Sequence, residues 1–369
     1  MRFREYLDKL GGTSFLYANA SNGLKDVLAH LVRASGTPRP NVVLPSYLPA
    51  KLYRTAMAAG CAVRPYEVYG PCTFDVADVE RQVDPDTIAI LYVHYFGFPH
   101  RLEEIAALAE RRGIPMIEDC ALTLAASHRG KALGTFGDVA IFSMRKVLLY
   151  SEGGFVRVSD RYRDFRPAYE WRVRSLFSAS RYLRQRMKYG YVRLTGGADP
   201  LGLFRVNPSG YLDLSRPQRL HVKAPSAFTE RRLGLADLDA VVRKRRENYA
   251  YLAQRLPASP LLEPLHPTLP EGCTPYSFPI LVPAGRRDRY RAELLEDGIV
   301  AGAGWPESPF DPALARTSEL SGRLVELPIH QALTQRQLDR SLKSLDRLAA
   351  VHPRLLGAEP RCLADLSGA

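Results

Sequence analysis

Short apolar runs alternate with helix-like segments through the first half of the chain. The run Ile88-Ala89-Ile90-Leu91-Tyr92-Val93 is continuous, as in a strand that is buried on both faces. Similar runs, and the helical segments that separate them, lie at 42–44, 51–59, 62–66, 101–112, 114–117 and 139–142. This alternation predicts a doubly wound α/β fold with a mostly parallel central sheet. Ligands of such sheets bind beyond the carboxyl ends of the strands.

Three polar side chains follow the ends of two of these predicted strands. Asp119 comes just after the run 114–117, and Ser143 and Lys146 come just after the run 139–142. A lysine amine, an anion and a hydroxyl donor are what pyridoxal phosphate (PLP) requires for its Schiff base, its ring nitrogen and its phosphate. The pattern therefore predicts a PLP site, with Lys146 and Asp119 as catalytic residues and Ser143 as a phosphate ligand.

Each of these residues also has an ordinary structural interpretation. A lone lysine is commonly exposed, an aspartate commonly caps a helix, and a serine commonly lies in a turn. The segment from Asn19 opens a predicted helix, whose free N–H groups favour an anion, but polar helix starts are common. The order of the residues, and the glycines Gly153 and Gly154 that follow Lys146, favour the cofactor interpretation.

The composition is that of a globular protein large enough for two domains. The 369 residues are 46% hydrophobic and 24% charged. No run of about eighteen apolar residues occurs, which argues against a transmembrane segment. The five cysteines are odd in number and widely spaced, which favours reduced thiols and a cytoplasmic location. The histidines show no metal-ligand spacing, so we expect no metal site.

Much of the net charge of +12 lies in a segment rich in arginine and tyrosine, Arg161–Arg193. One interpretation is a solvated helical face. Another is a surface that contacts an anionic substrate, an acidic carrier protein, an anionic membrane or another subunit. Basic residues interleaved with aromatic residues also occur in nucleic-acid sites, which is the least favoured of the three interpretations.

The second half of the chain has a different pattern. Glycine and proline punctuate 196–225, which predicts a loop-rich excursion, and 230–255 has the periodicity of one long helix. A smaller α+β unit is indicated beyond it by a strand and two helices at 278–282, 287–297 and 335–349. We therefore expect a large PLP-binding domain over residues 1–235, with a basic and aromatic excursion at about 160–225, and a small domain over 236–369.

Several motifs occur in the order and spacing that one enzyme family has. They are Pro45-Ser46, Val93-His94-Tyr95-Phe96-Gly97, Ile117-Glu118-Asp119-Cys120-Ala121, Gly134-Thr135-Phe136-Gly137-Asp138, Phe142-Ser143, Lys146, Glu152-Gly153-Gly154 and Leu327-Pro328-Ile329-His330. On these residues the chain, from about Asn19 to His330, resembles the DegT/DnrJ-type PLP-dependent aminotransferases, best known for aminating keto-sugars attached to nucleotides. The resemblance implies PLP transferase fold type I and a homodimer with the active site at the subunit interface.

The resemblance also assigns a role to the segment near the N-terminus. Ala20 and Ser21 match the family's phosphate-binding turn. One departure concerns Lys146, which follows Ser143 by three residues where members of the family usually have five. Its spacing to Gly153 is kept, so the assignment of the lysine stands.

Other departures concern the residues around the ring. Leu122 stands where the family often has Gln or His against one ring face. Pro49 stands where an aromatic residue usually stacks on the other face, and Tyr47 is a candidate substitute. Lys223-Ala224-Pro225 aligns with an Asn-x-Arg that the partner subunit usually supplies to the phosphate. Because these residues differ, the resemblance to the family says least about which substrate this chain uses.

The predicted function is transfer of an amino group from an amino acid, with Glu or Gln implied by the resemblance, to a keto group of a small sugar or biosynthetic intermediate. Lys146 would move the proton, and Asp119 would keep the ring nitrogen protonated. Elimination, racemisation or carbon–carbon bond formation on PLP is one alternative, motivated by the changed ring contacts. A degenerate homologue that binds a partner through the basic segment is another, and retention of Lys146 and Asp119 argues against it.

Overall fold

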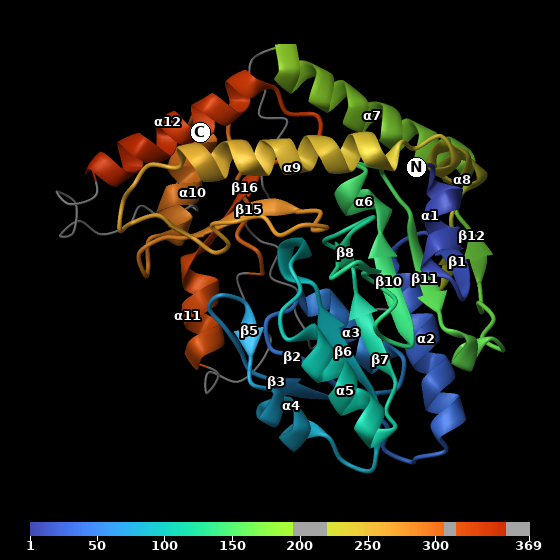
Figure 1. The fold of residues 1–369 in the computed structure, drawn as a ribbon. Helices are drawn as coiled ribbons and strands as arrows, with labels where there is room; N and C mark the ends of the chain where they lie inside the picture. Colours follow the sequence, from blue (N-terminus) through green and yellow to red (C-terminus); the bar gives the residue numbers. More distant parts are fainter. Residues whose placement is uncertain (195–219, 306–314, 352–369) are drawn as a thin grey trace.

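The structure is a computed structural model that describes residues 1–194, 220–305 and 315–351 (Figure 1). At its centre is a seven-stranded sheet in the order β1-β11-β10-β7-β6-β2-β3. Its strands are β1 (Thr13–Tyr17), β2 (Asn41–Pro45), β3 (Ala62–Tyr66), β6 (Thr87–Val93), β7 (Met116–Asp119), β10 (Val139–Ser143) and β11 (Gly154–Val158). The five strands from β10 to β3 are parallel, and β11 runs antiparallel to both of its neighbours. The predicted α/β fold is confirmed.

The central strands are apolar because helices and loops cover both faces of the sheet. Every residue of β6, β10 and β11 is buried. The helix α2 packs against β6, β10 and β11 as well as against α3. The helices of this part of the chain are α1 (Phe3–Leu10), α2 (Ala20–Ser35), α3 (Ala50–Ala58), α4 (Val76–Gln82) and α5 (Leu102–Arg112).

A smaller antiparallel sheet lies beside the first (Figure 1). Its strands and the helices near it are β14 (Glu263–Pro264), β15 (Ser277–Leu281), β16 (Leu324–Pro328), α9 (Leu238–Arg255), α10 (Arg287–Glu296), α11 (Ala315–Arg323) and α12 (Gln335–Val351). The backbone N–H of Tyr276 donates to the carbonyl of Phe96, 2.8 Å away, and thereby joins the start of β15 to the segment that follows β6. The small sheet therefore meets the large one at the carboxyl ends of the parallel strands.

Short elements complete the described part of the chain. They are β4 (Val68–Tyr69), β5 (Thr73–Phe74), η1 (Tyr95–Gly97), β8 (Ser127–His128), β9 (Lys131–Ala132), α6 (Met144–Val147), η2 (Asp160–Tyr162), β12 (Trp171–Arg172), α7 (Ser175–Leu194), β13 (Lys223–Ala224) and α8 (Ala227–Gly234). Within the described residues, none of the helices combines the length and the apolar character that crossing a membrane requires.

The prediction of one helix over 230–255 is wrong, because two helices occupy this segment. The helix α8 ends at Gly234, and the side chain of Asp237 accepts a hydrogen bond from the backbone N–H of Ala240 and so starts α9. Leu235 belongs to the apolar pattern of the sequence, yet it lies in the break and is 64% exposed. The predicted excursion at 196–225 falls mostly outside the described residues. The division into domains at residue 235 remains a proposal.

Candidate active site

Lys146 and Asp119 lie close together beyond the ends of two neighbouring strands. Asp119 is the last residue of β7 and pairs in register with Ile141 of β10, and α6 carries Lys146 just past the end of β10. Burial raises the pKa of the Asp119 carboxyl, and the charge of Lys146 opposes this rise. Burial lowers the pKa of the Lys146 amine, and the charge of Asp119 opposes this fall. The two predicted catalytic residues are thus electrostatic neighbours.

This environment changes what each group does chemically. A lowered pKa increases the fraction of neutral Lys146 amine, the form that attacks a carbonyl or takes up a proton. Asp119 is 5% exposed, and its Oδ1 accepts a hydrogen bond from the backbone N–H of Ala121 at 2.9 Å. That bond fixes the carboxylate at the edge of the sheet.

The start of α2 lies against the start of β11. Asn19 caps the helix, and Ala20 and Ser21 form its first turn. A Cβ atom on Gly154 would lie 2.5 Å from the backbone nitrogen of Ala20, so only glycine permits this approach. Ser143 pairs with Gly154 in the ladder between β10 and β11. The three residues predicted to bind the phosphate therefore converge on a helix N-terminus, which favours an anion.

We expect Gly154→Ala to destabilise the protein by about 1–3 kcal/mol, because the new methyl group overlaps the start of α2. The matched control is Gly322→Ala in α11, where an added Cβ meets nothing within 4 Å and the helix gains a better helix former. Urea unfolding followed by circular dichroism compares the two variants. Equal stability of both would contradict the close approach of α2 to β11.

Aromatic rings line the site next to Lys146. The Lys146 Nζ lies 5.9 Å from the centroid of the Trp305 ring, and that ring lies 5.0 Å from the ring of Tyr47. Tyr47 is fully buried, whereas Pro49 is the N-cap residue of α3. Tyr47 and Pro49 were the two candidates to stack on the cofactor ring. Of these two, Tyr47 packs with Trp305 beside Lys146. Leu122 is buried and apolar, as its sequence position indicated.

Basic side chains surround the same region. The pKa of Lys51, in the first turn of α3, is lowered by burial and by the charges of Arg145, Lys146 and Lys223. Lys223 stands beside the start of α2 of its own chain, because its carbonyl accepts the backbone N–H of Ala18 at 2.9 Å. A cluster of four cations favours an anionic ligand.

The described part of Arg161–Arg193 forms α7 and the segment before it. Arg172 forms an ion pair of 2.7 Å with Glu230, whereas Arg181, Arg184 and Arg186 are exposed on α7. The helix packs on α8, and its buried Ser178 donates a hydrogen bond to Glu152. The basic segment therefore contacts the loop between α6 and β11, which contains Glu152. What the basic segment binds is taken up as a proposal below.

One acidic residue near Lys146 was not predicted from the sequence. Glu326 of β16 accepts a hydrogen bond from the Ser277 hydroxyl at 2.8 Å. Burial raises the pKa of the Glu326 carboxyl, and the Ser277 bond and the charge of Lys146 oppose this rise. The sequence feature that could have indicated Glu326 is its position as a charged residue directly before the Leu327-Pro328-Ile329-His330 motif.

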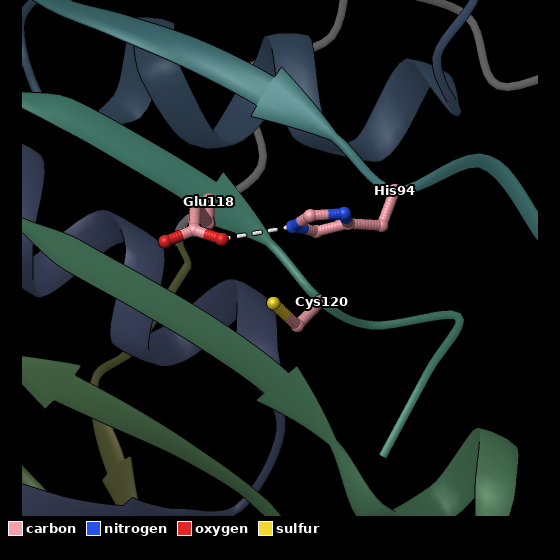
Figure 2. A group of neighbouring side chains, drawn as sticks. All are labelled: His94, Glu118 and Cys120. Atoms are coloured by element: carbon pink, nitrogen blue, oxygen red, sulfur yellow. Dashed lines mark hydrogen bonds and ion pairs between the residues drawn. The ribbon is translucent and has the colours of Figure 1, made fainter. Parts of the chain in front are cut away.

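His94, Glu118 and Cys120 form a buried group beside the site (Figure 2). The Glu118 carboxylate accepts hydrogen bonds from His94 Nε2 at 2.9 Å and from the backbone N–H groups of Gly134 at 2.9 Å and Gly137 at 2.7 Å. These bonds hold the loop at Gly134–Gly137 against the sheet, which gives the group a structural role.

The mostly parallel central sheet with helices on its faces places the chain in the α/β class. Among solved structures, the chain is similar to the aminotransferase TlmJ from Streptoalloteichus hindustanus, with a TM-score of 0.68 and 23% identity over 96% of this chain and 90% of that one. The glycine-supported helix start, the lysine with a lowered pKa and the buried aspartate fit PLP.

Residues 2–169 match the model of the DegT/DnrJ/EryC1/StrS aminotransferase family, the family that the motifs of the sequence resemble. It is 28% identical to dTDP-4-dehydro-2,3,6-trideoxy-D-glucose 4-aminotransferase of Saccharopolyspora spinosa over 89% of this chain and 77% of the relative. It is 45% identical to L-glutamine:2-deoxy-scyllo-inosose aminotransferase of Streptoalloteichus tenebrarius over 22% of this chain and 19% of the relative. The chain spans 19–24% of the length of the curated relatives that it matches over this short stretch.

Proposed function

We propose that this chain is a PLP-dependent aminotransferase that moves an amino group from Glu or Gln to a keto group of a small sugar or related biosynthetic intermediate. The observation that carries the proposal is the placement of Lys146 and Asp119 at the ends of neighbouring parallel strands, where the charge of each acts on the pKa of the other. The names of the relatives support the substrate classes. One is named for L-glutamine and 2-deoxy-scyllo-inosose, and the other for a dTDP-linked dehydro-sugar.

Different residues of the site would hold different parts of PLP. Lys146 would bind it covalently, Asp119 would face the ring nitrogen, and Ser143 with the turn at Ala20 and Ser21 would hold the phosphate. When bound, PLP supplies an electron sink that makes a proton on the neighbouring substrate carbon acidic.

The protein groups supply charge and proton transfer. The Asp119 carboxylate favours a protonated ring nitrogen, and its burial strengthens that interaction. The Lys146 amine accepts the proton from the substrate carbon and later returns it, which requires a pKa below that of an ordinary lysine. Tyr47 and Trp305 form an apolar wall that keeps water away from this proton transfer.

We also propose that the enzyme is a cytoplasmic homodimer, and that Arg161–Arg193 contacts an anionic part of the substrate, an acidic carrier or the other subunit. The exposed arginines on α7, Arg181, Arg184 and Arg186, support the contact with an anion. Reduced thiols support the location, and the described cysteines are all free and buried, namely Cys61, Cys72, Cys120 and Cys273.

The test is a visible absorbance spectrum of the full chain incubated with PLP, recorded before and after addition of Glu or Gln. We expect a visible band that Lys146→Ala lacks and that the amino donor bleaches. A band that depends on the lysine but ignores both donors would favour another PLP reaction. The absence of any band would favour the degenerate homologue that binds a partner.

A further inference from the structure

The helix α7 lies along the edge of the molecule and exposes apolar side chains there (Figure 1). Leu176, Leu183 and Met187 are 84%, 61% and 67% exposed. They are separated by seven and then four residues, so they form one stripe along the helix. Exposed apolar residues that are scattered singly are ordinary on protein surfaces, but a contiguous set on one face marks a contact with another apolar surface.

The opposite face of α7 is polar and is attached to the protein. The hydroxyl of the buried Ser178 donates to the Glu152 carboxylate, and the Ser178 carbonyl accepts a hydrogen bond from the Ser151 hydroxyl at 3.2 Å. The Tyr182 hydroxyl accepts a hydrogen bond from Arg232 of α8 at 2.9 Å. Rotation of α7 to bury its apolar stripe would break these bonds, so the fold keeps the stripe turned outward.

Positive charge lies on both sides of the stripe. Arg184 directly follows Leu183 in the sequence, and Arg186 directly precedes Met187. Because successive residues of a helix are rotated by about 100°, the two arginines lie on opposite sides of the stripe. Both arginines are exposed, and the helix Ser175–Leu194 contains no acidic residue. The outer face of α7 therefore has an apolar centre with a cation at each side.

This combination favours one occupant of the outer face, an anionic lipid surface. A second copy of the same face would bring arginines against arginines, and such like-charge contacts oppose association. A small anion would pair with the arginines but would leave the apolar stripe in water. An anionic lipid surface matches both features, because the apolar side chains enter the boundary of the acyl chains while the arginines reach the headgroups.

We propose that the outer face of α7, over Leu176–Met187, is an amphipathic anchor that holds this chain on a membrane surface rich in anionic lipid. The helix lies in the plane of that surface, with its apolar stripe toward the lipid and Ser178 toward the protein. The bond from Ser178 to Glu152 attaches the anchor to the loop that follows α6. The inference goes beyond the proposed function and does not depend on it.

The experiment is co-sedimentation of the full chain with vesicles of phosphatidylcholine and phosphatidylserine, compared with vesicles of phosphatidylcholine alone. We expect binding to the anionic vesicles that weakens as the salt concentration rises. Leu183→Ser combined with Met187→Ser should lower the affinity about tenfold or more, because less apolar surface enters the lipid. Arg184→Gln combined with Arg186→Gln should lower the affinity for the anionic vesicles to a similar extent, by roughly tenfold.

Matched controls place the same changes elsewhere on the surface. Met57→Ser, on α3, replaces a methionine that is 60% exposed, which is close to the exposure of Met187. Arg111→Gln combined with Arg243→Gln removes two exposed cations from α5 and α9. Both controls should keep the affinity within about twofold, because these residues lie outside the stripe and its flanks.

An unchanged amount of wild-type protein in the supernatant with anionic vesicles would overturn the proposal. Binding that the stripe variant and the arginine variant both retain would overturn it as well, since the lipid would then contact another face. Circular dichroism establishes that each variant is folded, and Leu176→Ser takes the place of a stripe substitution that does not fold. If the vesicles are not bound and the stripe variant turns a dimer into a monomer in analytical ultracentrifugation, the stripe is a contact between two copies of the chain.

Discussion

Replacing Lys146 with alanine is expected to lower the rate of amino transfer by about 10³-fold or more. The substitution removes both the nucleophile that holds the cofactor and the base that moves the proton, and a base of this kind alone contributes about 10²–10⁴-fold. The measurement is the rate of 2-oxoglutarate formation from Glu in the presence of PLP and a keto-sugar acceptor.

The control for this prediction is Lys131→Ala. Lys131 is exposed on β9, and its Nζ lies 4.4 Å from the centroid of the Phe136 ring. Its replacement should leave the rate within about twofold, because surface substitutions rarely perturb a distant site. A Lys146→Ala protein that kept full activity would exclude this lysine as the catalytic base.

The central sheet was predictable because its strands are uniformly buried. A continuous apolar run such as Thr87–Val93 has one structural solution in a chain that alternates strands with helices, namely a parallel strand covered on both faces. The antiparallel strand Gly154–Val158 was not predicted. Its direction depends on the connection from α6, and Gly153 and Gly154, where that connection enters the strand, were interpreted only as part of the cofactor motif.

The pairing of Asp119 with Lys146 was predictable from topology. Both follow parallel strands, and parallel neighbours end at the same edge of a sheet. Trp305 and Glu326 reach the same edge through the second sheet, more than 150 residues later in the chain. Local patterns do not contain the packing of one sheet against another, so the place of these residues near Lys146 was found only in the structure.

The break between α8 and α9 shows the limit of periodicity. Residues 230–255 keep a helical spacing of apolar residues throughout, but Asp237 competes for the backbone as a helix cap. The sequence alone does not distinguish an aspartate that caps a helix from one inside a helix. The packing of Leu238 and Leu233 on either side of the break decides between them, since both are buried while Leu235 is exposed.

Replacing Arg245 with leucine is expected to destabilise the protein by about 3 kcal/mol or more. Arg245 of α9 is 1% exposed, and its guanidinium donates to the carbonyls of Val147 at 3.0 Å and Tyr276 at 2.8 Å. A leucine would leave the Tyr276 carbonyl without this donor and the Val147 carbonyl with Gln331 Nε2 alone, at 3.1 Å. Val147 directly follows Lys146, so the loss also loosens the helix that carries the proposed catalytic lysine.

Two measurements distinguish this role from a general effect on packing. The thermal midpoint of Arg245→Leu should fall by several degrees, whereas Arg243→Leu, on the exposed face of the same helix, should change stability by no more than about 0.5 kcal/mol. The visible PLP band of Arg245→Leu, recorded below its midpoint, should also weaken, because α6 no longer has its anchor to α9. A variant that lost stability but kept a band of full strength would show that Arg245 supports the fold without positioning Lys146.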